Sequence, residues 1–230
     1  MAKDIFQQQG LAYAKYADDS FSWKNIELPC LKRHLTKHLK PSSNIIEAGS
    51  GSGRIIDYLK LNSIKEKNIT GIDSNKELIT LTKNKYPQAK FIQANICDRH
   101  LRPKKSDVII ASMVLHFLND KELDKALYNF NQWTHKGGFL FFVVAHPLRF
   151  ISRDLKQYFN TGWRNEKTPW NTKLPFWQRT IADYVNQTIS ADYNILVIDE
   201  PHLSARKKFN SEQAKYAQLP TRLAVLAQKK

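Results

Sequence analysis

Cysteine is scarce in this sequence, because the 230 residues include only Cys30 and Cys97. Two cysteines so far apart do not make the disulfide framework of a small secreted protein, and no Cys/His cluster along the chain indicates a metal site. The N-terminus lacks the apolar segment of a secretion signal. The longest purely apolar run, Phe139–Ala145, is far shorter than the ~20 residues of a membrane helix. We therefore expect a soluble, cytoplasmic protein with no membrane span and no metal.

Acidic residues are outnumbered, with 21 Asp+Glu against 36 Lys+Arg and a net charge of +15. An excess of this size is typical of proteins that bind nucleic acid. The lysines are scattered, however, and many fall on helix faces that are predicted to be exposed. RNA is therefore an alternative partner and a solvated basic surface is the main expectation. Hydrophobic residues make up 42% of the chain, which is enough for a core and excludes a disordered protein.

Apolar periodicity divides the chain into helices and strands. Residues 1–40 are predicted to be helical, with a leucine stripe over Leu28–Leu39 that ends at Pro41. Strands then alternate with helices, which predicts βαβ units and a parallel sheet with helices on both faces. The predicted strands are 45–48, 68–73, 90–94, 107–112, 139–145, 194–199 and 222–228. The predicted helices that connect them include 76–85, 120–134 and 181–190.

The segment from Glu47 to Gly53 is the most informative part of the chain. It joins a buried strand to a helix through glycines at 49, 51 and 53. Glycines permit a tight turn, and the helix N-terminus offers N–H groups to a nucleotide. The dinucleotide fingerprint Gly-x-Gly-x-x-Gly fails because residue 54 is arginine. A Walker loop fails as well, since no Gly-Lys-Ser/Thr follows.

An acidic residue two positions before Gly-x-Gly-x-Gly resembles motif I of the class I S-adenosylmethionine-dependent methyltransferases. Gly71-Ile72-Asp73 is similar to the second motif, in which the carboxylate accepts both ribose hydroxyls. Phe91–Ile96 resembles the third motif, with Asn95 at the position that meets the adenine amine. Asp107–Leu118 resembles the fourth strand and its following segment, and Lys136-Gly137-Gly138 precedes the fifth strand as in that family. The resemblance covers residues 45–145 well and the rest loosely.

The resemblance implies an α/β fold: a doubly wound, Rossmann-like sheet of seven mostly parallel strands with an antiparallel last strand. We expect a single methyltransferase domain over 1–230. Its parts are an N-terminal helical cap (1–40), a cofactor-binding core (41–145), a lid or acceptor insertion after the fifth strand (146–180), and the last helix and strands (181–230).

The implied cofactor is S-adenosylmethionine, with S-adenosylhomocysteine as product. The residues assigned to its binding are Glu47, Gly49, Ser50, Gly51, Gly53, Asp73, Ser74, Asn95, Ile96, Ala111 and Ser112. The candidate general bases are Tyr13, Tyr16, His116, His146 and His202. His116 is preferred because its segment follows the strand whose end borders the cofactor. As alternatives, Asp73 caps the following helix and Asn95 stabilises a turn.

Three functions are compatible with this sequence. The first is methyl transfer to an O, N or C nucleophile of a small molecule, because aromatic residues such as Tyr13, Trp163 and Trp170 flank the core. The second is methylation of tRNA or rRNA, in which those rings stack on bases and arginines meet phosphates. These arginines are Arg149, Arg153, Arg164 and Arg179. The third is a non-catalytic interaction module, which the intact cofactor motifs disfavour.

Two absences narrow the acceptor. The place after the fourth strand reads Ala111-Ser112-Met113-Val114, not the Asn/Asp-Pro-Pro-aromatic run of enzymes that methylate exocyclic amines of bases. That place also has no cysteine for methylation of pyrimidine C5. Gln178-Arg179 stands where some small-molecule enzymes have a His-Arg pair. The sequence identifies neither the acceptor nor the oligomeric state.

Overall fold

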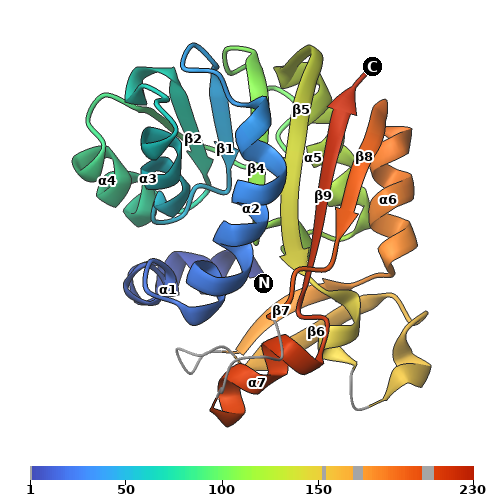
Figure 1. Cartoon of the computed structure of the whole chain (residues 1–230). Helices are drawn as coiled ribbons and strands as arrows, with labels where there is room; N and C mark the ends of the chain where they lie inside the picture. The colour runs from blue at the N-terminus through green and yellow to red at the C-terminus, as the bar shows by residue number, and fades with distance from the viewer. Residues whose placement is uncertain (1, 152–153, 168–172, 204–209) are drawn as a thin grey trace.

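A seven-stranded sheet forms the centre of the computed structural model, which describes residues 2–151, 154–167, 173–203 and 210–230. Its strand order is β3-β2-β1-β4-β5-β9-β8 (Figure 1). Neighbouring strands are parallel except at β9, which is antiparallel to both β5 and β8. The predicted Rossmann-like sheet with an antiparallel last strand is confirmed.

The strands of this sheet are β1 (Ile45–Ala48), β2 (Ile69–Asp73), β3 (Lys90–Gln93), β4 (Ser106–Ser112), β5 (Thr134–Ala145), β8 (Tyr193–Asp199) and β9 (Arg222–Lys229). A separate hairpin contains β6 (Gly162–Lys167) and β7 (Lys173–Gln178). The helices are α1 (Ala2–Ala17), α2 (Leu28–Leu35), α3 (Arg54–Leu61), α4 (Lys76–Lys85), α5 (Asp120–Trp133), α6 (Ile181–Ser190) and α7 (Ser211–Gln218).

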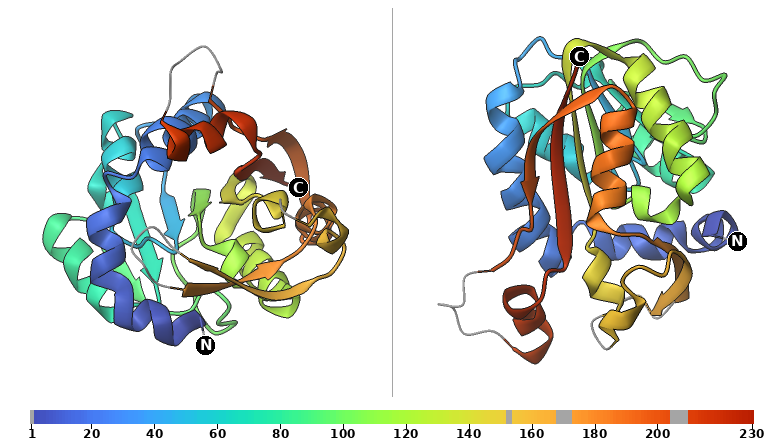
Figure 2. Two further views of the ribbon diagram at one scale, coloured as in Figure 1. Left: turned by 90° about the horizontal axis from the view of Figure 1, so that it is seen from below. Right: turned by 90° about the vertical axis from the view of Figure 1, so that its right-hand side faces the viewer.

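Helices cover both faces of the sheet, as the right-hand view of Figure 2 shows. Alternate strand residues point to opposite faces, so Ile45 packs with α2, α3 and α4, whereas Ile46 packs with α5 and α6. Capping boxes fix the starts of the second pair, with Asn119 before α5 and Thr180 before α6. The central strands β1, β4 and β9 are thereby buried, whereas β3 and β8 at the two sheet edges are partly exposed.

The N-terminal 40 residues are mostly helical, as predicted, but the helix with the leucine stripe ends earlier than its spacing predicts. A π-helical turn at Trp23–Glu27 separates α1 from α2. Pro29 falls in the first turn of α2, where a missing N–H costs no hydrogen bond. The helix ends at Leu35, followed by a 3₁₀ turn, and Leu39 is extended. The predicted end at Pro41 was therefore wrong by several residues.

The start of one strand and the presence of one helix also differ from the sequence prediction. β5 starts at Thr134 and not at Phe139, because Thr134 pairs with Ser106 before a register shift in the ladder. The helix α7 was not predicted, since its segment is polar and lacks a strong apolar period. None of the described helices has the length and apolar character that crossing a bilayer requires.

The carboxyl ends of the parallel strands are covered by parts of both flanking segments. Figures 1 and 2 show α1, the β6–β7 hairpin and α7 gathered at this edge of the sheet. α1 contacts both α4 and β7, so the N-terminal helix meets the hairpin across the strand ends. Arg153 and Trp170, which the sequence singled out in this insertion, lie outside the described residues.

Candidate cofactor and acceptor site

The glycine-rich turn lies between the end of β1 and the start of α3. Gly49, Gly51 and Gly53 all have positive φ, at 71°, 52° and 75°. A Cβ on Gly49 would lie 2.7 Å from Val114 Cγ2, and one on Gly53 would lie 2.7 Å from Tyr86 Cε2. Both the backbone conformation and the lack of space therefore require glycine at these positions.

Asp73, at the end of β2, is bonded to this turn. Its Oδ2 accepts a hydrogen bond from Gly51 N at 2.9 Å, and its Oδ1 accepts one from Asn75 N at 2.8 Å. Burial raises the pKa of Asp73, while the backbone N–H groups of Asn75, Gly51 and Ser74 oppose that rise. Three backbone donors fill most of the about four lone-pair positions of a carboxylate. Both ribose hydroxyls can bind Asp73 as the resemblance implies only if a backbone bond is released or shared.

The N-cap of α4 is Asn75 and not Asp73, the residue that the sequence offers as an alternative cap. The Asn75 side chain accepts a hydrogen bond from Leu78 N at the start of α4. Asp73 is therefore available to organise the glycine turn, which is a structural role that its position at the strand end permits.

Glu47, at the end of β1, is a buried carboxylate with little compensation. It is 2% exposed, and its Oε2 has no hydrogen-bond partner within the described part of the chain. Burial raises the pKa of Glu47 well above its ordinary value, with Arg54 opposing the rise and Asp73 adding to it. A site with this character favours a positively charged ligand.

Tyr13 from α1 lies over the turn. A Cβ on Gly51 would be 3.1 Å from Tyr13 Cε1. Burial raises the pKa of the Tyr13 phenol, and Glu27, Asp73 and Glu47 add to the shift. Nearby, Ser52 Oγ donates to Asp18 Oδ1 at 2.6 Å, which also fastens the turn to the segment after α1. The N-terminal helix therefore closes over the predicted cofactor position.

The other predicted cofactor residues lie at the ends of β3 and β4. Asn95 Oδ1 accepts a hydrogen bond from Cys97 N at 3.0 Å, as in the turn alternative, and Ile96 is part of the buried core. Ala111 and Ser112 end β4, and Ser112 Oγ is buried with no partner among the described residues. Glu47 and Asp73 thus lie beside the turn that the glycines form. Asn95, by contrast, is hydrogen-bonded within its own loop, and Ile96 packs in the core.

His116 lies in the 3₁₀ turn after β4, and this turn contacts β7 of the hairpin. His116 is 4% exposed, and its Nδ1 is 3.5 Å from Ala145 N, so the ring proton is placed on Nε2. Burial lowers the pKa of His116 well below its ordinary value, and the charges of Arg222, Arg149 and Arg179 lower it further. The imidazole is therefore neutral near pH 7.

The side chains beside His116 enclose a narrow gap that is too small to hold a water molecule. It is lined by His116, Ala145, Pro147, Trp177, Gln178, Arg179 and Tyr184. Gln178 is 1% exposed, and neither its Oε1 nor its Nε2 has a partner in the described residues. A wider hollow of about 540 Å³ beside Lys60 and Gln88 lies before β2 and β3 begin, at the opposite edge of the sheet. Its open, polar lining contains none of the predicted site residues.

The remaining candidate bases are less suitably placed. His146 is fully buried, with Nε2 2.7 Å from Glu200 Oε1 and Nδ1 accepting from Leu148 N, so both ring nitrogens are engaged. His202 is exposed. Burial raises the pKa of Tyr16, which makes its phenolate harder to form.

Sequence reasoning missed a buried ion-pair network below α1. Arg222 at the start of β9 donates to Glu27, whose other oxygen is 4.0 Å from Arg54 Nη2. Burial raises the pKa of Glu27, but the two guanidinium groups outweigh it and the pKa lies below its usual value. The guanidinium of Arg54 stacks on Trp23 at 4.7 Å. Of these residues, the sequence pattern indicates only Arg54, which breaks the dinucleotide fingerprint.

The residues of this site fit S-adenosylmethionine. The buried, unpartnered Glu47 oxygen favours a ligand with positive charge, and the cofactor carries both a sulfonium and an ammonium group. Because Gly49, Gly51 and Gly53 have no side chains, a ligand can approach the backbone of this turn closely. Asp73 and Ser112 supply polar groups on either side.

Comparisons with known proteins agree with this geometry. Residues 46–142 match the methyltransferase-domain family. The chain is similar to an uncharacterised methyltransferase of Bacillus cytotoxicus, 28% identical over 104 residues (45% of this chain and 48% of that protein). It is also similar to the ubiquinone/menaquinone biosynthesis C-methyltransferase of Campylobacter jejuni, 30% identical over 113 residues (47% of each chain). The chain thus spans about half the length of these relatives.

The fold is shared over a greater length. The crystal structure of an S-adenosylmethionine-dependent methyltransferase from Mesorhizobium loti superposes with a TM-score of 0.69 at 20% identity, covering 88% of this chain and 97% of that one. The domain match over residues 46–142 and this shared fold both agree with the class I S-adenosylmethionine-dependent methyltransferase family that the motif order resembles.

Proposed function

We propose that the protein is an enzyme that transfers a methyl group from S-adenosylmethionine to a small-molecule acceptor. The observation that carries the choice of acceptor is that two of the insertion's arginines are held in internal ion pairs, while Arg164 donates to the carbonyls of Trp163 and Asn160. Arg149 pairs with Glu166 at 2.8 Å, and Arg179 pairs with Asp120 at 3.2 Å. Arg179 is also fully buried and donates to the carbonyl of Leu118. Arginines committed to internal partners are poor ligands for RNA phosphates.

The cover over the strand ends supports the same choice. α1 meets β7 across this edge, and Tyr13 lies on the glycine turn. A compact acceptor can be enclosed beneath such a cover, which excludes water from the reacting groups. The relative named for ubiquinone and menaquinone biosynthesis is consistent with a small acceptor for the shared core.

The roles proposed for the cofactor residues follow from their positions. When bound, S-adenosylmethionine supplies an electrophilic methyl group on a positively charged sulfur, and its demethylated product is S-adenosylhomocysteine. Asp73 would accept a ribose hydroxyl, and the Glu47 carboxylate would compensate positive charge. Gly49, Gly51 and Gly53 would allow the close approach, with Ser50 and Ser74 beside them. Asn95 and Ile96 would border the adenine side, and Ala111 and Ser112 would border the cofactor on the other side of β1.

We propose that His116 and Gln178 contact the acceptor after the hairpin moves away from the turn that follows β4, because the gap between these side chains is too small for a ligand. The amide of Gln178 can both donate and accept, and it is buried beside His116 without a protein partner in the described chain. With its proton on Nε2, the neutral His116 ring presents a hydrogen-bond donor, so it would position the acceptor more readily than remove a proton from it. These two side chains favour an acceptor with adjacent donor and acceptor atoms.

The test uses S-adenosylmethionine with a tritiated methyl group, incubated with the protein and separately with a deproteinised metabolite extract or total RNA. We expect label in a low-molecular-weight product. Gln178→Ala should raise KM for that acceptor while leaving the Kd of S-adenosylmethionine unchanged, since the side chains around Gln178 include no residue of the glycine turn.

Label found in RNA, with a steep dependence of binding on salt, would establish the RNA alternative in place of the small-molecule proposal. Absence of cofactor binding by calorimetry, in protein shown by circular dichroism to be folded, would contradict the enzymatic proposal itself. The exposed acid Asp124, on α5, provides the matched control Asp124→Asn, which should change neither result.

A further inference from the structure

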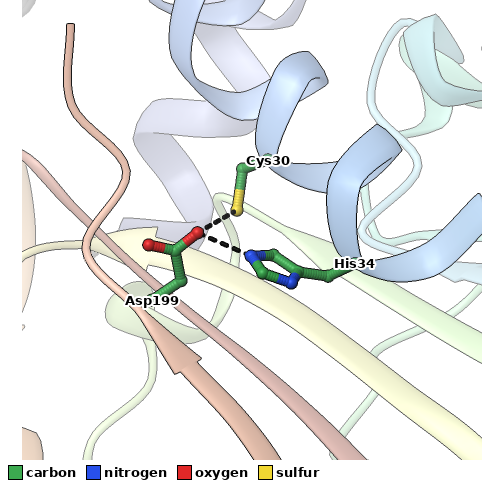
Figure 3. A group of neighbouring side chains, drawn as sticks. All are labelled: Cys30, His34 and Asp199. Atoms are coloured by element: carbon green, nitrogen blue, oxygen red, sulfur yellow. Dashed lines mark hydrogen bonds and ion pairs between the residues drawn. The ribbon is translucent and has the colours of Figure 1, made fainter. Parts of the chain in front are cut away.

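A cluster of three potential metal ligands lies where α2 meets the end of β8. Figure 3 shows Cys30 and His34 projecting from α2 toward Asp199. Cys30 Sγ is 3.7 Å from Asp199 Oδ2, and His34 Nε2 is 2.6 Å from the same oxygen. All three ligand atoms lie within 4.8 Å of one another. They come from elements 165 residues or more apart, so the spacing along the chain does not reveal the set.

The donor set and its spacing suit zinc. Thiolate, imidazole and carboxylate are the three side-chain ligands that Zn²⁺ prefers. Positions 30 and 34 are one helical turn apart, so both side chains leave the same face of α2. Zinc bonds of about 2.0–2.3 Å place tetrahedral donors about 3.3–3.6 Å apart. The Sγ–Oδ2 separation of 3.7 Å is about 0.1 Å longer than this range, and the Nε2–Oδ2 separation of 2.6 Å must lengthen by about 0.7 Å.

An ion pair alone accounts for only part of the cluster. Arg33 Nη1 also binds Asp199 Oδ2, at 3.1 Å, but the Arg33 side chain is 61% exposed and such pairs stabilise little. The buried thiol of Cys30 adds nothing to that charge balance. Burial, and secondarily the charge of Asp199, raises the pKa of Cys30 to about 12.

We propose that Cys30, His34 and Asp199 form a zinc-binding site that fastens α2 to β8. On binding, the Cys30 thiol loses its proton to solvent and forms the sulfur–zinc bond. His34 coordinates through Nε2 with its proton on Nδ1, Asp199 supplies one oxygen, and water completes the fourth position. The two ligand charges neutralise the dication. His34 and Asp199 are partly exposed, with 16% and 20% of their side chains accessible, so the ion can enter.

The test is titration of tag-free, metal-stripped protein with Co²⁺, followed by competition with Zn²⁺. We expect one ion per chain, a near-ultraviolet thiolate-to-cobalt band that zinc abolishes, and a higher Tm with zinc. Cys30→Ser should remove the band and Asp199→Asn should weaken zinc binding at least tenfold. Cys97→Ser retains the cluster and should bind as the wild type does.

Arg33→Gln separates the metal site from a simple ion pair. It removes the competing guanidinium but no ligand, so zinc affinity should be kept or improved. The proposal is overturned if the wild type gives no thiolate–cobalt band, if Cys30→Ser binds cobalt as tightly as the wild type, or if Arg33→Gln abolishes binding. The site lies on β8, at the sheet edge opposite β3, so none of these outcomes depends on the methyltransferase activity.

Discussion

Replacing Asp73 tests whether this residue binds the cofactor, holds the glycine turn, or does both. Asp73→Ala removes the acceptor of Gly51 N and of Asn75 N. Each hydrogen bond to a charged group is worth about 1.5–3 kcal/mol, and relief of the buried carboxylate offsets part of the loss. We expect a net destabilisation of about 2–4 kcal/mol, which lowers Tm by about 4–16 °C in a chain of this size. Loss of cofactor binding by this variant alone would therefore be ambiguous.

Asp73→Asn is the more informative substitution. Its Oδ1 keeps one backbone N–H, so Tm should fall by only about 2–8 °C, since one hydrogen bond is lost. It cannot accept a ribose hydroxyl at the second position, so the Kd of S-adenosylmethionine should rise about ten- to 150-fold. Calorimetry and thermal unfolding are measured on both variants and on Asp124→Asn. A Kd for Asp73→Asn within twofold of the wild type would refute the ribose contact. An unchanged Tm for Asp73→Ala would refute the structural role.

Three other substitutions test separate features. Gly49→Ala places a Cβ 2.7 Å from Val114 at a positive φ, so it should lower the free energy of unfolding by about 1–3 kcal/mol and weaken cofactor binding, measured by denaturant titration and calorimetry. The raised pKa of Glu47 means that a cationic ligand binds with release of a proton, so cofactor affinity should fall as the pH drops through that raised pKa, measured by calorimetry across a pH series. Glu47→Gln should bind weakly and show a flatter pH dependence. Arg222→Met leaves Glu27 charged and buried and should cost about 3–5 kcal/mol in urea unfolding; the double variant with Glu27→Met should recover much of this, and equal losses in both would contradict the ion-pair explanation.

Features encoded by neighbouring residues could be predicted from the sequence. The strand, glycine turn and helix around Gly49 are specified within ten residues, and their structural context is as expected. The alternation of strands and helices likewise gave the parallel sheet. The antiparallel last strand followed from its resemblance to a known family and is confirmed by the pairing of β9 with β5 and β8.

Features that depend on distant contacts could not be predicted. Nothing near Glu27 indicates that its partner is Arg222, 195 residues later. The burial of Gln178 results from the hairpin folding against His116, and its sequence context is that of an ordinary polar residue. The leucine stripe predicted a helix as far as Pro41 because periodicity cannot detect that the helix ends at Leu35 and continues as a 3₁₀ turn. The assigned roles of the cofactor residues, and of His116, remain predictions.

The position of β9 between β5 and β8 affects how the chain is made on the ribosome. The apolar β5 is complete at residue 145, but its second neighbour is supplied by residues 222–229. At about 5–20 residues per second, the outer edge of β5 stays unpaired for roughly 5–15 s of translation. An unpaired apolar edge is a template for association with other chains. A nascent chain stalled in this interval should therefore be a chaperone substrate, and release should require synthesis of the last strand.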